Sequence, residues 1–207
     1  MNMPISSELL ARFVSLVEPG AALTEPLDIA PHLLENRDKF HGLSRLVLKP
    51  RTVDEVSAIL KLACETGTPV VPQGGNTGLV GGQIPDLAGS SIILSLTRIN
   101  RVREIDPVGN TITVEAGVIL KTVQDAAADA DRLFPLSLGS EGSAVIGGLL
   151  SANAGGTAVL AYGNMRELCL GLEVVLPDGQ VMRGLKKLRK DNTGHDLRDL
   201  FIGAEGT

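Results

Sequence analysis

Three glycine-rich segments are the parts of this 207-residue chain whose residue types and spacing best suit chemistry. They read GGNTGLVGG (74–82), GSEGSAVIGGLLSANAGG (139–156) and GAEG (203–206), and the two long ones contain no Lys or Arg. Successive backbone N–H groups in a glycine-rich turn form a concave site that binds anions. One such segment alone would favour a turn or close helix packing. Three together favour a phosphate-bearing ligand held by main-chain amides.

The spacing of the glycines excludes two common phosphate sites. A Rossmann fingerprint needs GxGxxG, and no two glycines in this chain are two positions apart. A P-loop needs GxxxxGK followed by Ser or Thr, and that string is also absent. Transfer of a γ-phosphate generally requires a cation at the reacting centre. The segments therefore predict a bound diphosphate rather than a phosphate that is transferred.

Composition and charge restrict the possible partners and the compartment. The net charge of −5 without a basic block predicts no nucleic-acid partner. Residues 142–165 carry no charge, but they include six glycines, so we expect a buried or ligand-facing loop and no transmembrane segment. The opening MNMPISSELLARF lacks the build of a signal peptide, and Cys64 and Cys169 are expected to be buried free thiols. Together these features predict a cytoplasmic protein.

The helices and strands that must position the glycine segments can be predicted from the spacing of apolar residues and from capping and turn residues. Thr52 and Glu55 form a capping-box pattern that begins a helix, and Gly67 ends it. A hairpin is expected around residues 107–110 and a turn at residues 177–180. The other expected elements are helices over 6–18 and 120–130 and strands over 45–50, 69–72, 91–96 and 168–176. This mixture predicts an α+β fold with two lobes that meet near residue 100.

Four motifs resemble a known family. They are PQGGNTG, GSEGSAVIGGLLSANAGG, YGNMRELCLGLEVVLPDG and KDNTGHDLRDLFIGAEGT, in this order along the chain. Together they are similar to the FAD-binding domain of FAD-linked oxidases of the vanillyl-alcohol-oxidase or p-cresol-methylhydroxylase (PCMH) type. The D-2-hydroxy acid dehydrogenases, which act on D-lactate, glycolate or D-2-hydroxyglutarate, are the most similar branch. The resemblance implies a two-lobed PCMH-type FAD-binding domain, with an N-terminal helical and irregular segment (1–45), a first lobe (46–100) and a second lobe (101–207).

The resemblance also implies which residues bind the cofactor. In the family, the first loop wraps the FAD pyrophosphate, the second runs along the pyrophosphate, ribityl chain and flavin, and the last lies near the adenine half. Carried over to this chain, the predicted cofactor-binding residues are Pro72, Gln73, Gly74, Gly75, Asn76, Thr77, Gly78, Gly139, Ser140, Gly142, Ser143, Gly147, Gly148, Ser151, Asn153, Gly155, Gly156, Glu205 and Gly206.

Departures from the family pattern bear on how the flavin is held. Many relatives link FAD through a His in the first loop, where this chain has Asn76, and others use a Cys in the second loop, where residues 140–143 include none. Bound FAD is therefore expected to be non-covalent. His195 stands where the family usually has Tyr, and a surface or packing role is favoured over a catalytic one.

The implied function is the FAD-binding part of an FAD-dependent D-2-hydroxy acid dehydrogenase, in which hydride passes from the substrate α-carbon to flavin N5. In the family a substrate domain follows the last glycine segment, so no catalytic or metal-binding residue is predicted here and the chain is expected to be inactive alone. A stand-alone flavin-binding or electron-transfer module that needs a partner subunit is the alternative, and self-association is left open. A sugar-nucleotide enolpyruvyl reductase shares the flavin fold, but the KDNTG and LPDG strings disfavour it.

Overall fold

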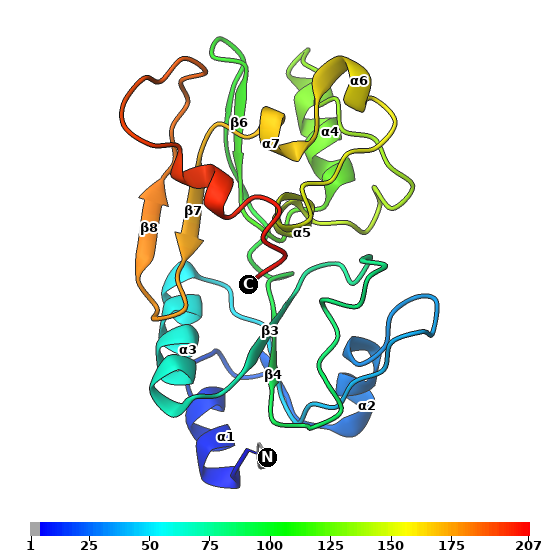
Figure 1. Cartoon of the computed structure of the whole chain (residues 1–207), viewed down its shortest axis with the longest axis vertical. Coiled ribbons are helices and arrows are strands. Elements are labelled where there is room, and N and C mark those ends of the chain that lie inside the picture. The colour runs from blue at the N-terminus through cyan, green and yellow to red at the C-terminus, as the bar shows by residue number, and fades with distance from the viewer. Residues whose placement is uncertain (1–4) are drawn as a thin grey trace. The chain divides into compact units, whose positions relative to one another are not determined.

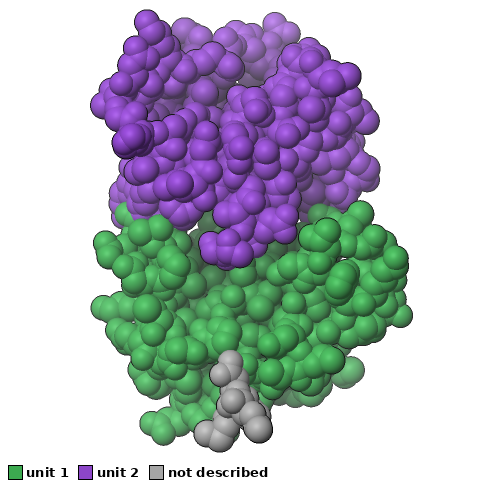
Figure 2. Space-filling model, viewed as in Figure 1, with its two compact units in different colours: residues 1–99, 175–181 green, residues 100–174, 182–207 purple. Residues whose placement is uncertain are grey.

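The computed structural model describes residues 5–207, and within them the chain forms two compact units. Unit 1 takes in the chain as far as Ile99 together with Val175–Val181, and unit 2 comprises Asn100–Val174 and Met182–Thr207 (Figure 2). Residues 1–4, the start of the MNMPISSELLARF stretch that was compared with a signal peptide, lie outside the described residues. Unit 1 thus includes the segment that the sequence analysis set apart as residues 1–45.

Unit 1 is built on a four-stranded sheet with the order β1-β2-β4-β3, of which β3 and β4 are labelled in Figure 1. Strand β2 (Val47–Leu48) pairs in parallel with β4 (Ile92–Ser95), which pairs in parallel with β3 (Val70–Gln73), and β1 (Ala22–Leu23) is antiparallel to β2. The strands are apolar on both faces, as expected where helices cover both sides of a parallel sheet. The first glycine segment follows directly from the carboxyl end of β3.

Three helices complete unit 1. Helices α1 (Ser7–Val14) and α3 (Val53–Thr66) pack in the cluster that contains Leu48, Ile92 and Leu94. Helix α2 (Pro26–Ile29), with a 3₁₀ turn over Ala30–His32, contributes Ile29 to the second cluster with Val47 and Ile93. Because successive side chains of a strand point to opposite faces, the two clusters cover the two faces of the sheet.

Unit 2 contains the β5–β6 hairpin, most of the β7 and β8 strands, and four helices, while the turn that joins β7 to β8 belongs to unit 1. Strand β5 (Val102–Asp106) pairs with β6 (Thr111–Val114), and β7 (Leu172–Val175) pairs with β8 (Val181–Gly184). Its core contains Val118, Leu120, Val123, Leu136, Ile146, Leu149 and Met165. The helices are α4 (Leu120–Asp129), α5 (Ile146–Ser151), α6 (Val159–Tyr162) and α7 (Met165–Leu168).

The structure confirms most of the expected elements and corrects several. The uncharged stretch 142–165, expected to be a loop, contains the short helices α5 and α6 and the start of α7. Helix α7 also takes the beginning of the strand expected over 168–176. Cys64 is free but exposed rather than buried, and Cys169 is half-buried. Within residues 5–207, the helices are too short or too polar to cross a bilayer.

Candidate functional site

The first glycine segment begins where β3 ends. Gln73, the last residue of β3, is 2% exposed, and Gly74 to Thr77 are half-buried. Among the described residues, no acceptor receives a hydrogen bond from the backbone N–H groups of Gly74 through Gly78. Five consecutive free amides in an uncharged turn after a buried strand are suited to bind an anion. The predicted residues Gly74 to Gly78 therefore form one run of main-chain donors in unit 1, directly after Pro72 and Gln73, which lie in β3.

Asn76 shapes this turn. Its backbone lies in the left-handed region at φ 52°, where Asn is better tolerated than most residues. Its side-chain amide donates to the Leu34 carbonyl at 2.9 Å and lies 3.4 Å from the Pro31 carbonyl. Asn76 therefore uses its side chain to anchor the turn, while its backbone N–H stays free.

In the second glycine segment, three glycines are required by packing within unit 2. A Cβ on Gly147 would lie 2.9 Å from the Ala116 side chain, and the Gly147 N–H donates to the Ala116 carbonyl at 2.8 Å. A Cβ on Gly156 would lie 2.1 Å from the Ser137 carbonyl, and one on Gly155 would lie 2.8 Å from Val159. These glycines permit close approach of the chain to itself.

Gly139, Gly142 and Gly148 have a different environment. A Cβ on Gly139 or Gly142 would have no neighbour within 4 Å, and one on Gly148 would meet only Val145, at 3.9 Å. Their backbone N–H groups also lack an acceptor among residues 5–207. Nothing in the described chain requires glycine here, so these three positions are the best candidates in unit 2 for contact with a ligand.

The structure brings the third glycine segment to the second one within unit 2. The N–H groups of Gly203 and Glu205 donate to the carbonyls of Leu150 and Ser151, both at 3.0 Å. The Arg166 guanidinium donates to the Ile202 carbonyl at 2.6 Å, and the Arg166 N–H donates to Asn153 Oδ1 at 3.0 Å. Asn153 and Glu205, with φ of 46° and 53°, therefore shape the backbone here.

The remaining predicted residues lie along the same stretch. The Ser140 carbonyl accepts the N–H groups of Ser143 and Ala144, which closes a turn before α5. Gly206 has a positive φ of 83° in the last segment. His195 is exposed, and the described residues include no group of three or more His, Cys, Asp or Glu arranged to hold a metal ion.

A surface hollow of about 430 Å³ in unit 2 is lined by other residues than the predicted ones. Helix α4, the segment after it and α6 line it, with Lys121, Arg132 and Tyr162 among the side chains. None of the predicted cofactor-binding residues borders it, and sequence reasoning gave no signal for it. We choose the glycine segments rather than this hollow as candidate cofactor-binding elements, because free backbone N–H groups can bind a diphosphate.

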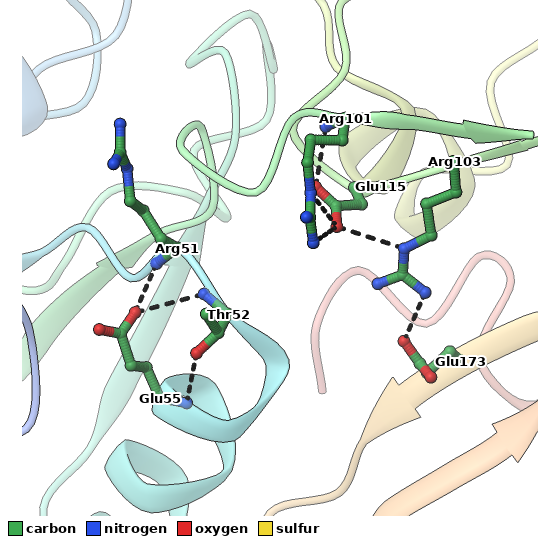
Figure 3. Close-up of polar contacts among 7 residues, drawn as sticks. All are labelled: Arg51, Thr52, Glu55, Arg101, Arg103, Glu115 and Glu173. Atoms are coloured by element: carbon green, nitrogen blue, oxygen red, sulfur yellow. Dashed lines mark hydrogen bonds and ion pairs between the residues drawn. The ribbon is translucent and has the colours of Figure 1, made fainter.

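A buried carboxylate at the base of the β5–β6 hairpin is a feature that sequence reasoning missed (Figure 3). Glu115 is 4% exposed, and it accepts hydrogen bonds from the Arg101 backbone at 2.8 Å, the Arg101 guanidinium at 2.9 Å and Arg103 Nε at 3.2 Å. Arg103 also donates to Glu173 at 3.0 Å. Burial raises the pKa of Glu115, but the hydrogen bonds outweigh it and hold that pKa below its ordinary value.

The chain matches the family model described as FAD binding domain over residues 44–184. Because this match covers more than half of the chain, the chain belongs to the FAD binding domain family, and FAD is its cofactor. Two solved structures share the fold. Alkyldihydroxyacetonephosphate synthase has a TM-score of 0.84 at 19% identity and covers 100% of this chain and 38% of its own. Substrate-bound p-cresol methylhydroxylase has a TM-score of 0.71 at 20% identity, covering 97% and 42%. The predicted α+β, PCMH-type fold is confirmed.

Relatives of known name match almost the whole chain. D-2-hydroxyglutarate–pyruvate transhydrogenase of Saccharomyces cerevisiae is 43% identical over 98% of this chain and 41% of its own length. A putative mitochondrial D-lactate dehydrogenase of Schizosaccharomyces pombe is 40% identical over 99% and 39%. The mitochondrial D-2-hydroxyglutarate dehydrogenase of Danio rerio is 43% identical over 98% and 38%. The chain thus spans about two fifths of the length of these relatives.

The predicted cytoplasmic location is wrong. Relatives from Schizosaccharomyces pombe, Danio rerio and Bos taurus are named as mitochondrial proteins. The prediction rested on the lack of a signal peptide and on free cysteines. Neither feature separates the cytosol from the mitochondrial interior, because a secretory signal reports only on secretion.

Proposed function

We propose that this chain is the FAD-binding part of an FAD-dependent D-2-hydroxy acid dehydrogenase. The observation that carries the proposal is the identity of about two residues in five, across 98% of the chain, to relatives named for D-2-hydroxyglutarate. In this proposal, units 1 and 2 correspond to the two lobes predicted from the sequence, and residues 1–45 join the first. The relatives' names favour a dehydrogenase over a stand-alone electron-transfer module.

The residues present fit FAD. The free amides of Gly74–Gly78 suit a diphosphate group, and the open positions at Gly139, Gly142 and Gly148 allow a flat or phosphate-bearing group to approach the backbone. The bound cofactor supplies two-electron redox chemistry, while the protein supplies binding and orientation. The predicted cofactor-binding residues are therefore proposed to act mainly through the main chain.

We propose that the flavin is held without a covalent bond. Where covalently linked relatives have a His in the first loop, this chain has Asn76. The amide hydrogens of Asn76 face the carbonyls of Leu34 and Pro31. Acid precipitation of the yellow protein should leave the colour in the supernatant. Flavin that stays with the precipitated protein would contradict this part of the proposal.

The substrate is proposed to be a D-2-hydroxy acid, with its binding groups supplied outside the matched region of the relatives. A carboxylate substrate calls for a cation, and its hydroxyl calls for a base. The two long glycine segments contain no Lys, Arg or His. This chain's contribution is therefore to hold the cofactor.

Gly75→Val tests the proposed cofactor site. The added methyl groups should block approach of the loop amides to the diphosphate, and losing one such bond costs about 1.5–3 kcal/mol, or tenfold or more in affinity. The dissociation constant for FAD, measured by fluorescence titration of apoprotein, reports the change. Ala88→Val serves as control because Ala88 is exposed, lies outside the three glycine segments and has no positive φ that a β-branched residue would resist. Equal affinity in wild type and Gly75→Val would place the diphosphate elsewhere.

A further inference from the structure

A network of side-chain amides lies behind the first glycine segment in unit 1. We propose that Gln83 is a positioning residue that, through Asn76 and beside Gln73, holds the Gly74–Gly78 amides in their anion-binding arrangement. This inference rests on the proposed function, because it names what sets the geometry of the same site. Gln83 was not among the residues predicted from the sequence.

Gln73, the buried last residue of β3, begins the network. Its Nε2 donates to the carbonyls of His32 and Gln83, both at 3.0 Å, which uses both amide hydrogens. Its Oε1 is left as the acceptor, and it pairs with His32 Nδ1. The His32 ring therefore carries a proton on Nδ1. A buried, fully bonded amide thus ties residues 32 and 83 to the end of β3.

Gln83 ties the glycine segment to itself. Its Nε2 donates to the Gly78 carbonyl at 2.8 Å and to Asn76 Oδ1 at 3.2 Å. A Cβ on Gly78 would lie 2.7 Å from Gln83 Oε1, so the amide packs closely against this glycine. The side chain thereby bridges positions 76 and 78 from behind the turn.

Asn76 connects Gln83 to the segment that contains Leu34. It accepts from Gln83 through Oδ1 and donates through Nδ2 to the Leu34 carbonyl at 2.9 Å. The Leu34 segment is itself fixed, because the fully buried Glu35 carboxylate accepts the N–H groups of Arg37 at 2.8 Å and Lys39 at 2.9 Å. The Arg37 guanidinium in turn donates to the Leu79 carbonyl.

The direction of these hydrogen bonds has a functional consequence. The side-chain amides donate to carbonyls in and around the turn, including that of Gly78, so those carbonyls are satisfied on the protein side. The backbone N–H groups of Gly74–Gly78 are not used by the network. A turn held in this way presents donors to an anion without the reorganisation that a free glycine loop would require on binding.

The test compares Gln83→Met with Gln180→Met in the 207-residue chain. Methionine keeps the length of the side chain and removes its hydrogen bonds. Gln180 is exposed on the β7–β8 turn, where its side-chain amide donates to the carboxylate of Asp178. The dissociation constants of apoprotein for FAD and for ADP are measured by titration, together with the Tm of each apoprotein. We expect Gln83→Met to weaken FAD and ADP by about tenfold or more, and Gln180→Met to match wild type.

A double-variant cycle separates positioning from simple loss of stability. Because Gln83 acts through Asn76, adding Asn76→Ala to Gln83→Met should weaken FAD little beyond either single change. Gln83→Leu, which is uncharged and also removes the side-chain hydrogen bonds, provides a second variant if Gln83→Met does not fold. Additive effects, or a loss of affinity that follows Tm in both glutamine variants, would overturn the inference.

The outcomes for the two proposals are distinguishable. If wild-type apoprotein binds neither FAD nor ADP, the proposed function fails. If wild type binds both and Gln83→Met binds them equally well, the positioning role fails while the proposed function stands.

Discussion

At the scale of single residues, Glu115 shows how a charge can be buried in a small unit. The carboxylate is almost fully enclosed, yet four N–H donors from Arg101 and Arg103 compensate its desolvation. Because these donors favour the charged form, the pKa of Glu115 is lower in the folded state than in the unfolded chain. Its contribution to stability is therefore present above the unfolded pKa and is lost as the pH falls through the lower folded pKa.

Glu115→Gln should lower the free energy of unfolding at pH 7 by about 1–3 kcal/mol, because a charge-assisted network becomes neutral. The difference from wild type should begin to shrink as the pH falls below the unfolded pKa of about 4.3, and it should vanish only once the pH has fallen through the lower folded pKa of Glu115. Urea unfolding at several pH values measures this. Glu104→Gln is the matched control, because Glu104 is exposed and its ion pair with Lys187 lies at the surface. A constant difference across the pH range would contradict the assignment.

Two neighbouring glycines should respond in opposite ways to the same change. Gly147→Ala places a Cβ 2.9 Å from Ala116, and the resulting overpacking should destabilise the apoprotein by about 1–3 kcal/mol. Gly148→Ala has room and lies in α5, so it should leave stability equal or about 0.5–1 kcal/mol higher. Thermal unfolding gives both values, and FAD titration should show weaker binding for Gly148→Ala. Unimpaired binding would remove Gly148 from the cofactor site.

At the scale of elements, α3 connects the start of the sheet to the first glycine segment. The Thr52 hydroxyl accepts from the Glu55 N–H at 3.1 Å, and Glu55 accepts from the Thr52 and Arg51 N–H groups at 3.2 and 2.6 Å (Figure 3). Gly67, at φ 62°, ends the helix in the left-handed conformation. The helix is therefore stopped at both ends by local sequence, and its length sets where β3 begins.

Thr52→Ala should destabilise unit 1 by about 1 kcal/mol, because the free N–H groups at the start of α3 lose their cap. Thr122→Ala in the exposed face of α4 is a control of opposite expected sign, since Ala raises helix propensity by up to about 0.7 kcal/mol. Chemical denaturation of the apoproteins measures both. Equal stabilities for wild type and Thr52→Ala would show that tertiary packing alone defines this helix start.

At the scale of the whole molecule, the chain spans about two fifths of the relatives' length, and we propose that its glycine segments bind the cofactor rather than a substrate. Positioning a substrate over a flavin can supply about 7–11 kcal/mol of barrier reduction. The first Arg after the second glycine segment, Arg166, donates to the Ile202 carbonyl and lies 3.6 Å from Asp199. Its guanidinium therefore binds the chain's last segment rather than a substrate carboxylate.

The 207-residue chain alone should therefore not oxidise D-lactate, D-2-hydroxyglutarate or glycolate at a measurable rate. Anaerobic mixing of the FAD-loaded protein with each acid, with the flavin absorbance followed, measures this. Dithionite serves as the positive control because it reduces flavin without a substrate site. Rapid bleaching by a D-2-hydroxy acid but not by its L-enantiomer would show that these residues contain a complete active site.

The sequence by itself determined the features that depend on near neighbours. The capping box at Thr52, the end of α3 at Gly67, and the hairpin between β5 and β6 all involve residues a few positions apart, and all are present in the structure. The ordered glycine motifs were also sufficient to indicate the family and its cofactor, because each motif is a continuous string.

Only the tertiary structure decided which glycines face the protein and which remain open. Gly147 is fixed by Ala116, and Gly156 by Ser137, and the residues in each contact are too far apart along the chain for a local rule to pair them. The same holds for Gln83 beneath Asn76 and for Glu115 beneath Arg101, whose roles arise from the hydrogen-bond partners that folding delivers. Local patterns encode backbone conformation, whereas burial and the satisfaction of polar groups are properties of the packed chain.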